Sequence, residues 1–463
     1  MPTHHRHSTS HLLSSGYRPV REEVTLPFPA VSGQLPAELD GTFLRIGPNT
    51  LDDHDPAVDH SFAGDAMVHG LRLRGGRAEW YRNRWVRTDR VARALGELPT
   101  PGPRHGLSDN TNCALVRHAG HTLALADGGA LPTRLGDRLE TLDRVDFDGT
   151  LPGGFSAHPV VDPLTQEMHA VAYEPGRPGV DHLTLDASGR VRRRENITVK
   201  DTPMMHAFSL TDREAIIYDL PVTYDARAAA AGSRVPYTWN DSHEARLGIL
   251  PREGTDADVR WMSIAPCFVF HPVNAYSRGR HIVIDVIRHE RAFDRDPLHP
   301  SESAPTLWRW TVDRAGGLVT EDRLSGETQE FPRIDDRYAG SPYRYAFTVE
   351  LHPDRGAALA GPALLRHDLV TGRVDRHRFG PGREGGEAVF VPRSANAPEG
   401  DGYLLSAVYD TASGTSDLVV IDTADFTGRP VAVVRLPVRV PHGFHAEWVA
   451  AEPFRAVDDL AWP

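Results

Sequence analysis

A recurring hairpin pattern constrains the fold of this chain more than any other feature. An apolar strand, a short polar turn that ends in glycine and a second strand follow one another in LRLRGGRAEW from Leu71, LTLDASGRV from Leu183, WTVDRAGGLV from Trp310, HDLVTGRV from His367 and VIDTADFTGRPV from Val420. Glycine supplies the positive φ that such tight turns require. Helical periodicity is scarce, and the best helix candidate is the Ala-rich segment 225–231, closed by Gly232. The pattern predicts an all-β protein.

The spacing of these hairpins favours a propeller. The last two lie roughly fifty residues apart, which is near the length of a four-stranded propeller blade. A sandwich or barrel built from many hairpins is the alternative. No linker divides the chain, because the Gly-rich segment 382–386 is only long enough for a loop. We therefore expect a single domain over residues 16–463, after a disordered N-terminal tail over residues 1–15.

Charge and cysteine content exclude several classes of protein. The net charge is -12, from 51 Lys and Arg against 63 Asp and Glu, so the chain lacks the basic excess of a nucleic-acid binder. The two cysteines, Cys113 and Cys267, belong to no C-x-x-C pair, which argues against a disulfide framework or a cysteine-based zinc site. The N-terminal segment lacks the apolar region of a signal peptide, and no run of 18 apolar residues follows. We expect a cytoplasmic protein.

Four histidines stand in apolar surroundings and are candidates for a metal site. They are His158 in FSAHPVVDP, His206 in PMMHAFSLT, His271 in CFVFHPVNAY and His445 in VPHGFHAEWV. Long stretches of chain separate them, unlike the pairs of a helical H-E-x-x-H site. Only a closed fold that returns each strand to one centre, such as a propeller, would bring them together. Spacing alone leaves open four unrelated core histidines.

Longer motifs carry a family resemblance through nearly the whole chain. In order, they are GTFLRIGPN, FAGDAMVHG, YRNRWVRT, NTN, LADGGAL, FSAHP, MMHAF, CFVFHPVNAY, EFPRID, GEAVFVPR and HGFHAEW. The sequence resembles the carotenoid cleavage oxygenases, which include apocarotenoid, carotenoid and stilbene-cleaving enzymes. The resemblance implies a seven-bladed β-propeller with a dome of helices and loops over the metal-bearing axis. It also implies a ferrous ion held by four histidines, which match His158, His206, His271 and His445 here; the GFH motif selects His445 over the nearby His442.

The resemblance further implies three carboxylates that accept hydrogen bonds from ligand imidazoles and so fix their orientation. By motif position, Asp127 would serve His206. In the same way, Glu330 would serve His271 and Glu387 would serve His445, whereas His158 would have no such partner. Asp127 stands where the family usually has Glu, so we expect a bridging water or a small strand shift to preserve its contact. For each acid, a surface carboxylate is the alternative.

The activity implied by the resemblance is that of a non-haem Fe(II) dioxygenase. It would use O2 to cleave a C=C bond of an apolar conjugated substrate, a carotenoid or apocarotenoid, into two carbonyl products. The alternative is a stilbene or phenylpropanoid alkene, for which relatives engage a substrate phenol with a Tyr and a Lys. The only lysine, Lys200, precedes His206 by six residues and matches no such position, whereas Tyr81 is either a phenol contact or a packing residue. These observations favour a polyene.

Two other functions remain open at this stage. A non-enzymatic propeller could serve as a binding module, although the complete histidine and acid set argues against it. Some relatives are isomerases with the same metal residues, and oxygen consumption distinguishes them from oxygenases. The implied partner is an apolar conjugated small molecule and not a nucleic acid. Family members also contact membranes peripherally to collect substrate, but no segment here identifies such a patch.

Overall fold

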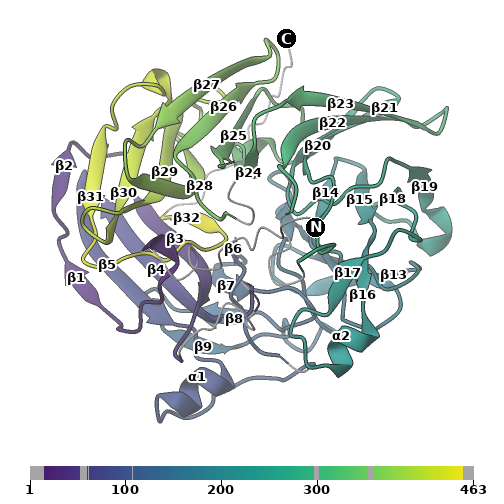
Figure 1. Cartoon of the computed structure of the whole chain (residues 1–463), viewed down its shortest axis with the longest axis horizontal. Helices are drawn as coiled ribbons and strands as arrows, with labels where there is room; N and C mark the ends of the chain where they lie inside the picture. The colour runs from purple at the N-terminus through teal and green to yellow at the C-terminus, as the bar shows by residue number, and fades with distance from the viewer. Residues whose placement is uncertain are drawn as a thin grey trace, which may run out of the picture.

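The computed structural model describes residues 15–52, 60, 62–106, 108–296, 302–352 and 358–451. The expected N-terminal tail, apart from Ser15, lies outside the described residues. Within the described part, seven antiparallel sheets of four or five strands surround one axis (Figure 1). The predicted all-β class and the seven-bladed propeller are therefore confirmed.

The first three blades come mainly from the N-terminal part of the chain. Blade 1 contains β1 (Thr25–Pro27), β3 (Gly41–Asn49), β4 (Asp65–Arg74), β5 (Arg77–Trp85) and β32 (Ala446–Ala450). Blade 2 contains β6 (Ala114–His118), β7 (His121–Leu125), β8 (Thr133–Leu135) and β9 (Thr141–Arg144). Blade 3 contains β10 (Val160–Val161), β11 (Met168–Ala172), β12 (Val180–Leu185) and β13 (Val191–Ile197).

The remaining four blades complete the ring. Blade 4 contains β14 (Phe208–Leu210), β15 (Glu214–Asp219), β18 (Arg246–Pro251) and β19 (Arg260–Ser263). Blade 5 contains β20 (Pro272–Arg278), β21 (His281–Arg288), β22 (Thr306–Asp313) and β23 (Leu318–Ser325). Blade 6 contains β24 (Gln329–Arg333), β25 (Tyr345–Glu350), β26 (Ala363–Asp368) and β27 (Arg373–Arg378). Blade 7 contains β2 (Val31–Gly33), β28 (Arg383–Pro392), β29 (Gly402–Asp410), β30 (Thr415–Asp422) and β31 (Ala432–Arg435).

Strands from opposite ends of the chain close the ring. The late strand β32 is the innermost strand of blade 1 and pairs with β3, and the early strand β2 pairs with β31 at the outer edge of blade 7 (Figure 1). The backbones meet closely at Gly47 and Gly443: a Cβ on Gly47 would lie 2.6 Å from the Cα of Gly443. Glycine is therefore required at this approach.

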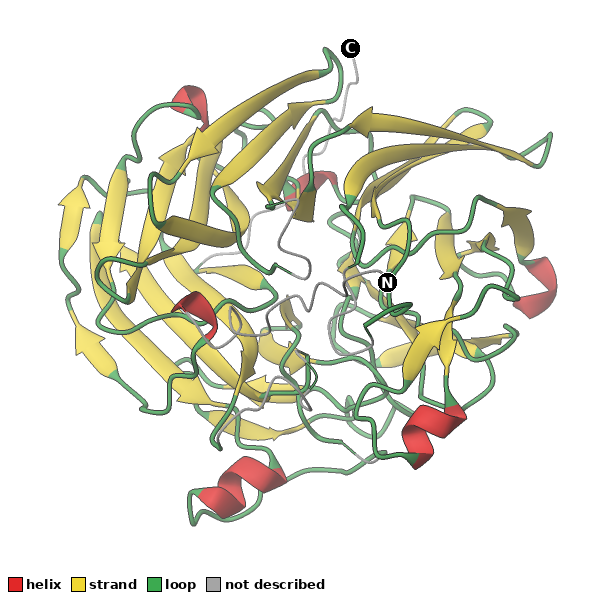
Figure 2. Cartoon of the chain, in the orientation of Figure 1, coloured by secondary structure: helices red, strands yellow, loops and turns green. Residues whose placement is uncertain are grey.

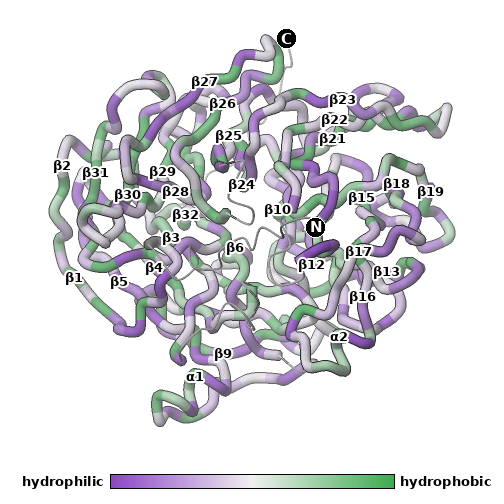
Figure 3. The backbone as a smooth tube through the Cα atoms, in the orientation of Figure 1, coloured by the Kyte–Doolittle hydropathy of each residue, from purple (hydrophilic) through white to green (hydrophobic). Residues whose placement is uncertain are grey.

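All five hairpins expected from the sequence are present. They join β4 to β5, β12 to β13, β22 to β23, β26 to β27 and β30 to β31. In the first turn, Gly75 and Gly76 have φ values of 52° and 73°, which glycine adopts without the steric cost of a Cβ. The outermost strands either alternate between apolar and polar residues or are polar throughout, because one of their faces meets solvent. Strand β27, largely hydrophilic in Figure 3, is an example.

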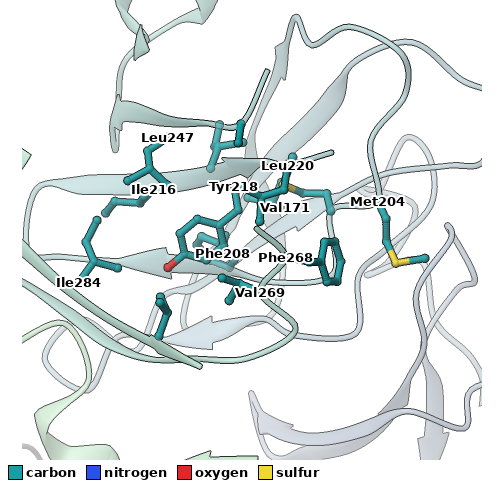
Figure 4. Close-up of a cluster of buried hydrophobic side chains, with 14 of the residues drawn as sticks. Val171, Met204, Phe208, Ile216, Tyr218, Leu220, Leu247, Phe268, Val269 and Ile284 are labelled. Atoms are coloured by element: carbon teal, nitrogen blue, oxygen red, sulfur yellow. The ribbon is translucent and has the colours of Figure 1, made fainter. Parts of the chain in front are cut away.

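The main hydrophobic core lies between blades 3, 4 and 5. Strand β15 is buried along its whole length, and its Ile216 and Tyr218 pack with Phe208 of β14 and Phe268 before β20 (Figure 4). Smaller clusters fill the spaces between the other blades. Packing of blade against blade therefore holds the inner strands, and the residues that precede them, in fixed positions around the axis.

Few described elements lie outside the blades (Figure 2). They are α1 (Asp89–Ala94), α2 (Ala226–Ala230), the hairpin of β16 (Val222–Tyr224) and β17 (Tyr237–Trp239), and the short 3-10 turns η2 (Ser15–Tyr17), η3 (Asp256–Asp258), η4 (Asp336–Tyr338) and η5 (Thr423–Asp425). The helix expected at 225–231 is α2, capped by Asp225 and followed by Gly232 with a φ of 90°. The dome over the axis remains a prediction. Among the described helices, none has the length and apolar character needed to cross a bilayer.

Candidate metal centre

The four candidate histidines occupy equivalent positions in four blades. Each lies one or two residues before the innermost strand of its blade: His158 before β10, His206 before β14, His271 before β20 and His445 before β32. Since the blades repeat the same topology around the axis, residues at this position gather at one end of it. The fold thus brings together side chains that lie far apart in the sequence.

The imidazoles face one another at short range. Nε2 of His206 lies 3.4 Å from Nε2 of His271. The ring of His158 has its centroid 4.4 Å from that of His206, 5.4 Å from that of His271 and 4.7 Å from that of His445. The ring nitrogens that face one another, one each from His158, His206 and His271, all lie within 4.8 Å of one another. The site is enclosed: His445 is 8% exposed and the other three are partly buried.

The three carboxylates contact the histidines that the family resemblance assigns to them. Nδ1 of His271 lies 2.6 Å from Glu330, and Nδ1 of His445 lies 3.0 Å from Glu387. Nδ1 of His206 forms a shorter contact with Oδ2 of Asp127. Asp127 follows β7 of blade 2, Glu330 lies in β24 of blade 6 and Glu387 lies in β28 of blade 7. Each of the seven blades therefore contributes one residue to the centre.

The contact of Asp127 differs from our expectation in one respect. Of the two ways in which we expected this contact to be preserved, a bridging water is not needed, because the shorter carboxylate reaches His206 directly; the small strand shift stays a prediction. Asp127 lies in the loop after β7 rather than inside a strand, and its other oxygen accepts the backbone N–H of Ala157 at 3.4 Å.

Charges around the centre keep two of the acids ionised. Burial raises the pKa of Glu387, but His445, Arg333 and the backbone N–H of Ala446 outweigh burial and lower it to about 2. Burial likewise raises the pKa of Glu330, yet His271 and His289 bring it well below its usual range. Both groups are therefore anions that accept hydrogen bonds from imidazole.

The imidazoles themselves respond to burial and to their neighbours. Burial lowers the pKa of His445 to about 4, although Glu387 partly opposes this effect. Burial also lowers the pKa of His158, and the adjacent imidazoles lower it further. Neutral imidazoles are the form that binds metals.

His158 alone among the four has no carboxylate partner in the described part of the chain. Its Nε2 instead lies 3.7 Å from Sγ of Cys113, a buried free cysteine. Donor atoms of Cys113, His158 and His445 also lie within 4.8 Å of one another. The sequence alone assigns no role to Cys113.

Two further residues beside the centre were not foreseen. His289 donates from Nε2 to Glu330 at 3.0 Å, so that one carboxylate holds both His289 and His271. Arg45 donates to the backbone oxygens of Phe444 and Gly443, next to His445. Arg45 could have been singled out from the sequence, because it lies in the GTFLRIGPN motif. The sequence does not indicate which residue either Arg45 or His289 contacts.

Other residues considered from the sequence lie away from the imidazoles. Lys200 is exposed in the loop after β13. Tyr81 is 1% exposed in the core of blades 1 and 7, and its hydroxyl is 2.8 Å from Nδ1 of His69, so it is a packing residue. His442 approaches Glu384 at 3.3 Å and belongs to a separate contact.

Aromatic side chains cover one side of the centre. Phe270 meets His206 edge-on at 5.4 Å between ring centroids. Phe62 meets Phe444 at 5.3 Å and Phe270 at 6.2 Å. Phe293 extends the same group, with its ring 6.2 Å from Phe270. The surroundings are therefore apolar beside a polar imidazole cluster.

This arrangement suits a divalent transition metal. In His206, His271 and His445, the Nδ1–H donates to a carboxylate, which leaves Nε2 as an unprotonated acceptor. Two acceptor nitrogens only 3.4 Å apart repel each other unless a cation lies between them. Imidazole ligands suit iron, zinc, copper and nickel, and the hydrogen-bonded carboxylates would hold the rings in place.

Comparisons with known proteins agree with this architecture. The family profile described as RPE65, retinal pigment epithelial membrane protein, matches residues 17–450. A carotenoid cleavage oxygenase of Mycobacterium tuberculosis is 43% identical, with 93% of this chain and 95% of that protein aligned. The crystal structure of a Pseudomonas brassicacearum lignostilbene dioxygenase superposes with a TM-score of 0.86 at 29% identity, covering 95% of this chain and 98% of that one. Cobalt-substituted Synechocystis apocarotenoid oxygenase superposes with a TM-score of 0.85 at 26% identity, covering 96% and 99%.

Proposed function

This chain belongs to the carotenoid cleavage oxygenase family, and from that premise we propose that it is a non-haem Fe(II) dioxygenase that cleaves a C=C bond of a carotenoid or apocarotenoid. The products would be two carbonyl fragments. The observation that carries the proposal is the convergence of four imidazoles, three of them oriented by carboxylates. A non-enzymatic binding module would not need such a set.

His158, His206, His271 and His445 would hold the iron. When bound, Fe(II) supplies the activation of O2 that protein side chains cannot provide. The carboxylates keep the proton of each oriented imidazole on Nδ1, so that Nε2 stays available as a ligand. Four neutral imidazoles would hold the ion without cancelling its positive charge.

The apolar side of the metal centre would bind the substrate. Phe62, Phe270 and Phe293 form an aromatic group beside His206. Such a surface suits a long conjugated hydrocarbon and excludes water from the reacting bond. The exposed position of Lys200, the sole lysine, also favours a polyene over a substrate that needs a lysine beside its phenol.

One observation supports a stilbene as the second candidate. The hydroxyl of Tyr237 is buried and has no hydrogen-bond partner in the described part of the structure. Burial and the charge of Asp127 raise the pKa of Tyr237, so this hydroxyl is a neutral donor. A substrate phenol would satisfy it. The similar Pseudomonas structure is that of a lignostilbene dioxygenase.

The test offers both substrates in one reaction. Fe(II)-loaded protein receives an apocarotenal and a 4-hydroxystilbene in air, with His271→Ala as the inactive control, and products are identified by mass spectrometry. Polyene-derived aldehydes would support the proposal, whereas aromatic aldehydes would move the assignment to stilbenes and to Tyr237. Oxygen consumption is recorded in parallel, because turnover without oxygen uptake would show an isomerase. Near-normal turnover by His271→Ala would contradict the metal assignment.

A further inference from the structure

We infer that Cys113 is an additional metal donor of this centre, and that its sulfur binds a thiophilic divalent cation together with the histidines. The inference rests on the proposed function, because it requires that the histidine cluster holds a metal. It goes further in assigning a sulfur ligand and a preference for one class of ion.

The blade repeat places Cys113 where the other blades place histidine. Cys113 lies one residue before β6, the innermost strand of blade 2, just as His271 and His445 lie one residue before β20 and β32. Its backbone N–H donates to the carbonyl of Leu125 at 3.0 Å, which anchors it beside the end of β7. Blade 2 therefore directs a thiol to the end of the axis to which blades 1 and 5 direct imidazoles.

The sulfur lies within reach of the same ion as two of the histidines. Sγ of Cys113 is 3.7 Å from Nε2 of His158, and the donor atoms of these two residues and His445 lie within 4.8 Å of one another. A metal bound by imidazole at about 2.1 Å and by thiolate at about 2.3 Å joins atoms at such separations after only small side-chain movements. In the described part of the chain, His158 is also the one histidine of the four without a carboxylate partner, and its Nε2 faces this thiol.

Apolar side chains surround the thiol. Cys113 packs with Ala126, Ala130, Ala157 and Phe444. A cation would replace the thiol proton, which leaves to solvent; no electrons are transferred.

A sulfur donor changes which ions the centre prefers. Four imidazoles alone leave two positive charges on the ion, whereas one thiolate cancels one of them and takes one coordination position. Thiolate ligands favour soft or borderline ions such as Co²⁺, Zn²⁺ and Cd²⁺ over harder ones. Cys113 would thus make the centre prone to capture thiophilic ions in place of iron.

The test uses Co²⁺, whose bond to thiolate produces a charge-transfer absorption in the near ultraviolet. Anaerobic protein is titrated with Co²⁺ as wild type, Cys113→Ser and Cys267→Ser, and bound cobalt is measured after gel filtration. Cys267 is the matched control, because it is also free and buried but packs in the core of blades 4 and 5. We expect the charge-transfer band in wild type and Cys267→Ser. Cys113→Ser should lose the band while retaining the visible bands of bound cobalt.

The outcomes separate this inference from the proposed function. Stoichiometric cobalt in the wild type without a charge-transfer band would overturn the role of Cys113 and leave the histidine centre intact. A band that persists in Cys113→Ser would overturn it as well. Wild-type protein that binds no cobalt and no iron would overturn the proposed function itself. Cys113→Ala, with thermal unfolding recorded for every variant, shows whether a lost band reflects the missing sulfur or a misfolded chain.

Discussion

The guanidinium group of Arg45 donates a hydrogen bond of 2.8 Å to the backbone carbonyl of Phe444, a residue 399 positions later in the chain. The same group donates to Gly443 at 2.6 Å, and the N–H of Ile46 donates to the carbonyl of His445 at 3.0 Å. Strand β3 thus fixes the segment that delivers His445. The contacts that help to close the propeller ring therefore also position His445.

Arg45→Met should weaken both stability and iron binding. The substitution leaves two buried carbonyls without their donor, at a cost of about 1–3 kcal/mol for each unsatisfied group. It also releases the backbone beside His445, so iron affinity should fall together with the free energy of unfolding. Arg144→Met is the control, since Arg144 is a buried arginine in β9 of blade 2 that binds Thr100 and Asp109. A loss of stability with unchanged iron affinity in Arg45→Met would limit Arg45 to a structural role.

His445→Ala and His442→Ala form a matched pair within one short segment. His445 belongs to the imidazole cluster, whereas His442 contacts Glu384. We expect His445→Ala to lose iron at concentrations that saturate the wild type, and His442→Ala to retain it. Iron content is measured by elemental analysis, and circular dichroism verifies that both variants keep their sheets. Equal iron loss in the two variants would contradict the assignment of His445.

Asp127→Asn should reduce iron affinity by about 10–100-fold, the usual effect of removing the carboxylate that orients a ligand. The amide keeps the size of Asp127 but loses the charge that holds the N–H of His206. Asp127→Glu should lose less, because a longer carboxylate can still reach Nδ1 after a small adjustment of the loop. The affinities come from competition with a chelator. If Asp127→Asn binds iron as tightly as the wild type, the contact with His206 has no role in metal binding.

Protonation of His367, a residue of β26 in blade 6, should lower the free energy of unfolding in acid. Burial lowers the pKa of His367 to about 4, whereas an unfolded histidine has a pKa of about 6.5. Between these values the unfolded chain binds more protons than the folded one, so stability is full above pH 6.5 and is lost as the pH falls toward 4. His367→Gln should reduce the slope of the free energy of unfolding against pH by up to about 1.4 kcal/mol per pH unit. Urea denaturation of the metal-free protein at several pH values measures it, and an unchanged slope would contradict the prediction.

The sequence predicted the local structure well, because the signals for it are local. Glycines that permit positive φ mark the hairpin turns, and Asp225 and Gly232 bracket α2. The four histidines and three acids were named from motifs, and the structure brings them to one end of the axis. Their pairing followed from resemblance to relatives, since no spacing in the chain reveals that Glu387 meets His445.

Contacts that depend on the closed ring could not be predicted. Cys113 carries no motif of its own, and its approach to His158 arises only when blades 2 and 3 pack against each other. Tyr81 was an equal candidate for substrate contact or packing until the structure placed its hydroxyl against His69. The direct contact of Asp127 with His206 joins blades 2 and 4, and the geometry of the loop after β7 decides it.

Sequence signals are enough to predict the hairpins, the all-β class and the residue types available for metal binding. These depend on backbone preferences and side-chain chemistry within a few residues of each position. Only the folded ring reveals that each of the seven blades brings at least one of these residues to the axis. A metal site requires atoms from residues hundreds of positions apart in the sequence to lie within a few ångströms of one another. Here the pairing of β3 with β32 and the packing of neighbouring blades hold them at that distance.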